Sequence, residues 1–290
     1  MASILRQLLF FCIIIFPLSS CRQSARNQSH LQIAQDDKEW MEKFWHDLLF
    51  KEGGAYTLWG SKPITEIAVY HYSEEEMAEF IRQLPEEELE NCYTDKQYDF
   101  PENWKRWETA CVNFPFKRHL LFKSHYSEDN KISYIYFVNV IKTALLLQDN
   151  YDLFRKEVGF DFQPLEVVLE IPNKSSDFWE KLETSKNSFL IWGLLFGYGK
   201  QNASLFNWKY QSLNKPSEDF VQRIYNKPSN PSPKGQTNLS VNNFLLPSFI
   251  SFTEDDETVY NYQSEREKIR RIYKNKDLLK ITLEKLTLDD

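Results

Sequence analysis

An unbroken apolar run close to the N-terminus, Leu8 to Phe16, separates the first residues of this chain from the part that can fold in water. A basic start with Arg6 precedes the run, and Pro17 and small residues follow it. A helix that crosses a bilayer needs about 20 apolar residues, which is more than this run supplies. The three-part layout is typical of a secretory signal. We therefore predict that residues 1–20 are a signal peptide and that the folded protein begins after them.

The end of this segment, Leu18-Ser19-Ser20-Cys21, resembles the lipobox of bacterial lipoproteins. In that family the cysteine thiol receives a diacylglyceryl group, the signal is cut just before the cysteine, and the new amine is acylated, for example with palmitate. The resemblance implies that Cys21 is lipidated and holds the protein to a membrane of the bacterial cell envelope, in the periplasm. Arg22 follows, where family members kept at the inner membrane have Asp, so the resemblance implies the outer membrane.

An ordinary secretory signal with a chance cysteine at position 21 is the alternative interpretation of the same residues. The protein would then be an exported effector without lipid. The tether between anchor and fold is the same in both cases. Residues 21–35 are polar and repeat no apolar period, so we expect a flexible spacer behind the lipidated cysteine.

The composition of the chain indicates a packed protein and excludes some partners. Aromatic residues make up 16% of the chain, with 22 Phe and only 8 Gly. A formal net charge of −7 argues against a general nucleic-acid binder and against electrostatic adhesion to anionic lipid. We expect contact with the membrane through the lipid anchor, envelope proteins as partners, and no nucleic acid.

The cysteines and histidines follow no known metal-binding spacing, such as C-x-x-C or H-E-x-x-H, so we predict no metal site and no cofactor. Cys12 leaves with the signal peptide and Cys21 carries lipid, which leaves Cys92 and Cys111. This pair lies in an oxidising compartment and is a candidate disulfide. Two buried free thiols are the alternative, because cysteine is often simply a core residue.

Hydrophobic periodicity predicts a single α+β domain over residues 36–290, mainly helical, with a small antiparallel sheet or hairpin and a C-terminal helix. A helix opens at Asp36 and carries Trp40, Phe44 and Trp45 on one stripe, which packs into the core or, less simply, binds a partner. The other expected helices begin near residues 73 and 85 or cover residues 103–114, 141–158, 164–171, 176–184, 185–212 and 254–288.

The strand pattern is strongest at residues 119–125 and 131–140, which flank a polar turn and predict a hairpin. Residues 67–72 alternate weakly, and residues 244–252 resemble an edge strand interrupted by Pro247. The apolar spacing of the C-terminal tail fits a helix that docks on its own domain or forms a short coiled coil.

The segment GLLFGYGKQNASLF, Gly193 to Phe206, has the glycines and lysine of a phosphate loop but not their spacing. We expect a helix that breaks at Gly197-Tyr198-Gly199, with Tyr198, Lys200 and Asn202 on its exposed side. These residues are weak candidates for a ligand site. A cleft near Gly197–Asn202 would suit an envelope hydrolase or a small-ligand binder.

Three histidines, His71, His119 and His125, are further weak candidates, because a histidine beside a carboxylate can act as a general base. His119 and His125 would share a face of one strand. No G-x-S-x-G motif or other nucleophile pattern accompanies them, so we assign no catalytic residue.

Two stretches, EGGAYTLWGSKPIT at residues 52–65 and FLIWGLLFGYGKQNASLFNW at residues 189–208, resemble uncharacterised lipoproteins of chlamydia-like bacteria. That resemblance implies no activity and transfers no catalytic residue. Our leading hypothesis is a lipid-anchored envelope protein with a partner-binding or structural role. The sequence leaves open whether it is an enzyme.

Overall fold

The computed structural model describes residue 33 and residues 35–70, 74–83, 100–124, 132–173, 175–212, 239–253 and 255–288. The chain divides into a short N-terminal unit, residues 1–37, and a large one, residues 38–290. The predicted signal peptide and the tether up to residue 32 lie outside the described residues, as does the expected helix start near residue 85.

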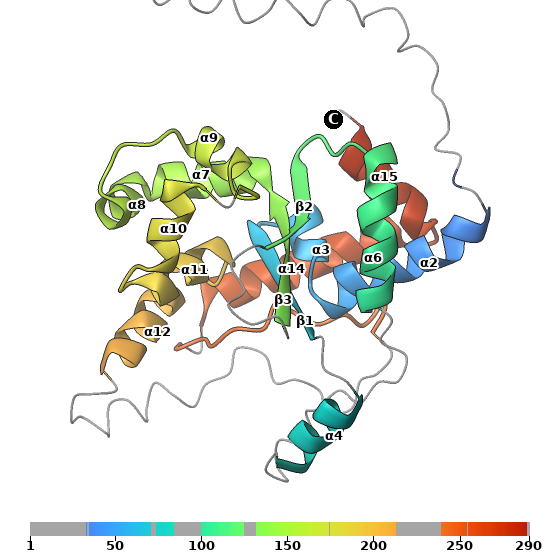
Figure 1. Cartoon of the computed structure of the whole chain (residues 1–290), viewed down its shortest axis with the longest axis horizontal. Coiled ribbons are helices and arrows are strands. Elements are labelled where there is room, and N and C mark those ends of the chain that lie inside the picture. Colours follow the sequence, from blue (N-terminus) through green and yellow to red (C-terminus); the bar gives the residue numbers. More distant parts are fainter. Residues whose placement is uncertain are drawn as a thin grey trace, which may run out of the picture. The chain divides into compact units, whose positions relative to one another are not determined.

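The described chain is mainly helical with one small antiparallel sheet, which confirms the predicted fold class (Figure 1). The helices are α2 (Gln35–His46), α3 (Ala55–Leu58), α4 (Glu74–Gln83), α6 (Phe100–Ala110), α7 (Val140–Asp149), α8 (Tyr151–Val158), α9 (Pro164–Leu169), α10 (Asp177–Glu183), α11 (Ser188–Leu195), α12 (Lys200–Ser212), α14 (Glu257–Tyr273) and α15 (Leu278–Thr287). A π-helical turn, η1 (Asp47–Lys51), continues α2, and a 3₁₀ turn, η2 (Cys111–Asn113), follows α6.

The sheet contains β1 (Ile64–Tyr70), β2 (His119–Lys123) and β3 (Ile132–Asn139) in the order β1-β3-β2. The predicted hairpin is confirmed: β2 pairs with β3 in antiparallel register, with Leu121 opposite Phe137. The weakly alternating segment is also a strand. It pairs with the other edge of β3, with Ile64 opposite Val138. The central strand is therefore the one richest in β-branched and aromatic residues, as strand propensity favours.

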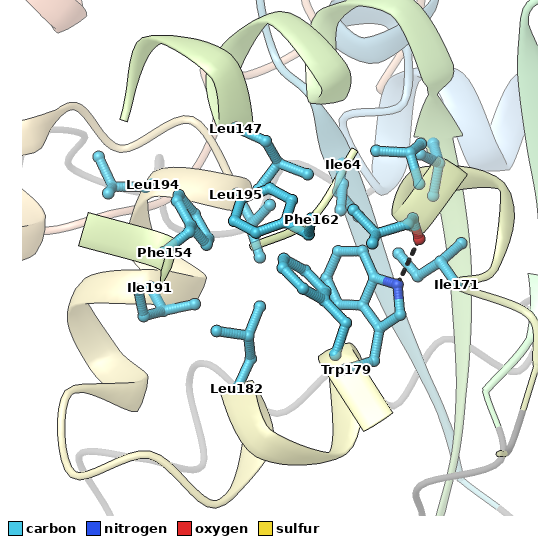
Figure 2. Close-up of a cluster of buried hydrophobic side chains, with 14 of the residues drawn as sticks. Ile64, Leu147, Phe154, Phe162, Ile171, Trp179, Leu182, Ile191, Leu194 and Leu195 are labelled. Atoms are coloured by element: carbon cyan, nitrogen blue, oxygen red, sulfur yellow. Dashed lines mark hydrogen bonds between the residues drawn. The ribbon is translucent and has the colours of Figure 1, made fainter. Parts of the chain in front are cut away.

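One face of the sheet packs against α7 to α12. Because side chains alternate along a strand, Tyr136 and Val138 of β3 point to the same side as Ile64 of β1, and all three are buried in one hydrophobic cluster. Figure 2 shows Ile64 beside side chains from these helices. Trp179 of α10 lies in the same cluster and donates its indole N–H to Val167 O at 2.6 Å. Its one polar group is thus satisfied inside an apolar core.

The other face of the sheet receives the aromatic stripe of α2. The Trp45 ring lies 6.2 Å from that of Phe137 in β3, and 5.1 Å from that of Trp107 in α6. Phe44 stacks on Phe100 of α6 at 5.4 Å. Phe44 and Trp45 are fully buried and Trp40 is 8% exposed, so the interpretation of the stripe as core is confirmed and the partner-binding one is wrong for these residues.

Three elements differ from the sequence prediction. The helix expected over residues 141–158 is broken at Asn150, whose side chain donates back to Leu146 O at 3.0 Å and so closes α7. Residues 244–252 form no strand except a single bridge at Ile250; Pro247 lacks the N–H that a ladder requires. The C-terminal helix is two helices, with a left-handed Asn275 at φ 58° between them.

Both C-terminal helices dock on the domain, which is the first of the two alternatives that the sequence left open for the tail. Tyr262, Leu279 and Leu283 are buried, and Lys117 N donates to Leu286 O at 2.9 Å. The Tyr273 hydroxyl accepts from Trp59 Nε1 at 2.9 Å. The apolar residues that recur every three to four positions in this tail therefore form contacts within the chain.

Candidate functional site

Four of the residues singled out in the sequence, Cys21, His71, Cys92 and His125, lie outside the described residues. Cys111 follows α6 directly, and its Sγ lies 3.4 Å from Glu108 O. The Cys92–Cys111 disulfide and the lipidation of Cys21 therefore stay predictions.

The break predicted at Gly197-Tyr198-Gly199 is confirmed and forms the turn between α11 and α12. Gly197 and Gly199 have φ values of 77° and 80°, which side-chain-bearing residues rarely adopt. The Tyr198 ring stacks on Phe249 at 5.3 Å, and burial raises the pKa of its hydroxyl to about 12. Tyr198 is thus a packed residue, while Lys200 is exposed at the start of α12.

Asn202 is buried and its amide is fully used inside the protein. The amide nitrogen donates to Tyr198 O at 2.9 Å and to Asp256 Oδ2 at 2.8 Å, and Oδ1 accepts from Phe252 N at 3.3 Å. Asp256 in turn caps α14 by accepting from Thr258 N at 2.8 Å. Asn202 therefore ties the α11–α12 turn to the segment before α14. Tyr198, Lys200 and Asn202 do not converge on a common ligand position.

A buried polar cluster lies where β1 begins and β3 ends. Lys62 Nζ donates to Thr65 Oγ1 at 3.1 Å, and Thr65 Oγ1 is 2.8 Å from Thr57 Oγ1. The Asn139 side chain donates from Nδ2 to Thr57 O at 3.1 Å and accepts at Oδ1 from Lys142 N, which caps α7. Burial lowers the pKa of Lys62 to about 8. The cluster holds α3, β1, β3 and α7 together.

His119 closes this cluster on the β2 side. Its Nε2 lies 3.2 Å from Asn139 Nδ2, and its ring stacks on Phe137 at 5.3 Å. Only 4% of the residue is exposed, and burial lowers its pKa to about 4. Nδ1 is buried and has no hydrogen-bond partner among the described residues. The side chain beside His119 is an amide, not the carboxylate that a general-base pair requires.

The Lys62–Thr65 contact contains the groups with which a lysine activates a hydroxyl nucleophile. Thr65 is 0% exposed and Lys62 7% exposed, so a substrate has no access to either group in this conformation. We therefore interpret the contact as structural. Sequence analysis did not find it, because Lys62 stands in a loop-like stretch and no local pattern marks it as buried.

A pocket of about 500 Å³ opens between the start of α8, the α8–α9 turn, α9 and the start of α10. Its floor is the outer layer of the hydrophobic cluster on the sheet: Phe162, Val167 and Phe178 are buried there. The Phe162 ring centroid lies 4.7 Å from that of Tyr151 and 4.7 Å from that of Phe178. The further lining residues are Phe160, Asp161, Gln163, Glu166, Glu170, Asn173, Ser175, Ser176 and Asp177.

Hydrogen bonds fix the rim of this pocket. Tyr151 Oη accepts from Phe162 N at 3.2 Å and donates to Asp161 Oδ1 at 3.4 Å. Ser176 Oγ donates to Glu170 Oε2 at 3.1 Å on the opposite side. The pocket therefore has an aromatic floor with ordered oxygen groups around it, and its lining is more polar than that of most small-molecule sites.

Four carboxylates line this pocket, and its described lining residues include no basic side chain. Asp161 pairs with Arg155 Nη1 at 3.5 Å, and Glu170 accepts from Ser176. Glu166 and Asp177 are exposed and have no side-chain hydrogen bond or ion pair among the described residues. The sequence does contain a signal of this pocket, because Asp161 stands between Phe160 and Phe162 and Asp177 precedes Phe178. It was missed because their common orientation depends on the turn at residues 159–163.

Within the described ranges, no group of histidine, cysteine and carboxylate side chains is arranged to hold a metal ion. In the same part of the chain, no helix is long and apolar enough to cross a membrane. Comparison of the chain with protein-family models, with known proteins and with solved structures finds no match. Functional conclusions therefore rest on this chain's own residues.

Proposed function

We propose that this chain is a lipid-anchored protein of the bacterial cell envelope that acts by binding a partner or ligand. The observation that supports the anchor is the position of Leu18-Ser19-Ser20-Cys21 directly behind the apolar run Leu8–Phe16. A thiol at this place is the group that the lipoprotein pathway alkylates. Two or three acyl chains hold a protein firmly, because each buried methylene contributes roughly 0.8 kcal/mol.

The residue after Cys21 bears on which of the two membranes of the envelope holds the protein. Arg22 takes the place of the aspartate that retains family members at the inner membrane, so we propose that the protein is sorted to the outer membrane.

The proposed binding role is supported by what the described polar residues do. His119, Lys62 and Thr65 are buried; Lys62 donates to Thr65, and His119 contacts the Asn139 side chain. The pocket between α8, α9 and α10 is open, and its described lining residues include carboxylates, amides, hydroxyls and aromatic rings but no cysteine, histidine or lysine. No described lining residue supplies a histidine or lysine base beside the serine hydroxyls, so we favour recognition over activation of a serine nucleophile. A small-ligand binder, the second candidate function, is favoured by this same pocket.

The anchor is tested by expressing the full chain in a bacterial host and separating membranes from soluble envelope contents. We expect the wild-type protein in the membrane fraction and Cys21→Ala in the soluble fraction or retained as uncut precursor. Cys12→Ala, which changes a cysteine of the apolar run, is the matched control and should remain with the membranes. Intact mass should show a chain that begins at Cys21 and carries a diacylglyceryl group and one further acyl group.

Two outcomes would contradict the proposal. A Cys21→Ala variant that is cut normally and still sediments fully with membranes would exclude the lipid anchor. A wild-type chain that is cut elsewhere and carries no lipid would instead support an exported effector.

A further inference from the structure

We propose that the pocket between α8, α9 and α10 binds an organic cation, an ammonium group on a short apolar body. This inference rests on the binding role proposed above and is independent of the lipid anchor. The chemical source of the cation is either a free amine or the lysine side chain of a protein. Both present the same group to the pocket.

The size of the pocket limits the occupant. A volume of about 500 Å³ lies within the usual range of small-molecule sites and is too small for a folded partner. It accommodates a short aliphatic chain or one inserted side chain. The buried rings of Phe162 and Phe178 at its floor offer apolar contact, and each methylene removed from water contributes roughly 0.8 kcal/mol.

The negative charge of the lining residues favours a positively charged ligand. Asp161, Glu166, Glu170 and Asp177 come from the α8–α9 turn, α9 and α10, and none of the described lining residues carries a positive charge. A phosphate, a carboxylate or another anion would be repelled by Glu166, Glu170 and Asp177, whereas Arg155 offsets the charge of Asp161. Glu166 and Asp177 are available, because no described side chain bonds or pairs with either. Hydrogen bonds from an ammonium group to a carboxylate are about twice as strong as neutral ones.

The protein already contains an example of the proposed contact at the edge of this pocket. Lys181 Nζ donates to Val158 O at 3.0 Å and lies 5.2 Å above the centroid of the Phe160 ring, which lines the pocket. An ammonium group over an aromatic face is a favourable contact. Divalent cations are the competing cationic class, and the described carboxylates are not arranged to hold one.

The test is calorimetric titration of the full mature chain, purified with its anchor in a nonionic detergent. The probes are 1,5-diaminopentane, a capped Ala-Lys-Ala tripeptide, and 1,5-pentanediol, which matches the diamine in length and has no charge. We expect the diamine or the peptide to bind at least about tenfold more tightly than the diol, and more weakly at high salt. Binding of the diamine alone identifies a free amine as the source, and binding of the peptide alone identifies a lysine side chain.

Two matched variants locate the site. Glu166→Gln removes one exposed carboxylate of the pocket with little change of shape, and we expect it to weaken binding about fivefold or more. Glu180→Gln makes the same chemical change at an exposed position of α10 outside the lining, and should change binding less than about twofold. Circular dichroism verifies that both variants are folded.

Three results would overturn the inference. Equal binding of diamine and diol would show a cavity that does not select charge. Equal weakening by the two variants would show general attraction to an acidic chain. If neither cation gave a heat of binding at millimolar concentration, the pocket would be a water-filled depression that binds no cation. None of these results affects the lipid anchor, which fractionation of Cys21→Ala tests separately.

Discussion

At the scale of single residues, the burial of His119 predicts how the stability of the protein depends on pH. Burial, with smaller effects of the nearby cations Lys142, Lys285 and Arg118, lowers its pKa in the folded protein to about 4. A histidine in the unfolded chain has a pKa of about 6.5. Below pH 6.5 the histidine is therefore protonated in the unfolded state but stays neutral in the folded state. The free energy of unfolding falls as the pH is lowered, until the pH reaches about 4.

The variant His119→Phe should remove this pH dependence. Phenylalanine keeps the stacking on Phe137, and Asn139 Nδ2 keeps its bond to Thr57 O. Between pH 6.5 and 5, the histidine should cost the wild type about 1.5 kcal/mol of unfolding free energy, and the variant should lack this loss. Urea midpoints measured by tryptophan fluorescence test it. His46→Gln, a change at a half-exposed histidine, should keep the loss, and equal pH profiles for wild type and His119→Phe would contradict the assignment.

At the scale of elements, the α11–α12 turn depends on glycine for two separate reasons. Gly197 has a positive φ, and its carbonyl accepts from the Tyr262 hydroxyl at 2.8 Å. A Cβ at Gly197 would collide with that same hydroxyl and approach Pro63 Cδ at 3.2 Å. Gly159, which ends α8, has a similar φ of 84° but open space around it.

This pair of glycines separates backbone strain from steric collision. Gly159→Ala should cost about 1 kcal/mol of unfolding free energy, the usual penalty of a side chain in the left-handed region. Gly197→Ala should cost at least about 1 kcal/mol more, because Tyr262 is buried and cannot move away without breaking its bond. Urea unfolding of the two variants measures both values. Equal losses would mean that the turn shifts freely and that the Tyr262 contact does not constrain it.

The elements that the sequence predicted are those set by local chemistry. Apolar spacing predicted the helix with Trp40, Phe44 and Trp45, and the polar turn between two β-rich runs predicted the β2–β3 hairpin. The break at Gly197 was visible because glycine is the residue that a positive φ needs. Pro247 was correctly recognised as an obstacle to a strand, yet the apolar residues around it pack without one.

What the sequence could not predict depends on contacts between distant segments. The bond from Asn139 to Thr57 O joins residues far apart in the chain, and no local pattern marks it. Asn202 looked like an exposed candidate, because its partner Asp256 lies beyond a long loop-like stretch. The pocket arises where α8, α9 and α10 meet, so its four carboxylates looked like ordinary surface residues of short helices.

At the scale of the whole molecule, β3 is shared by two hydrophobic cores. Tyr136 and Val138 enter the core formed with α7 to α12, and Phe137 enters the one that contains Trp45 and α6. Neither core can lose its contacts while the other keeps an intact central strand, since alternate residues of one strand serve both. We therefore expect residues 38–290 to unfold in one cooperative transition.

A pair of cavity-forming variants tests this cooperativity. Leu195 lies in the α7–α12 core and Leu283 in α15, and both are 0% exposed. Leu195→Ala and Leu283→Ala should each cost about 2–5 kcal/mol of unfolding free energy. In protein labelled with 5-fluorotryptophan, the ¹⁹F resonances of Trp179 and Trp45 report the two cores separately. Each variant should lower the urea midpoint of both resonances equally, because the shared strand couples the cores. If the Trp179 resonance of Leu195→Ala showed its unfolding transition at a lower urea concentration than the Trp45 resonance, the α7–α12 core would unfold on its own. The cation pocket above that core could then open while the rest of the fold stayed intact.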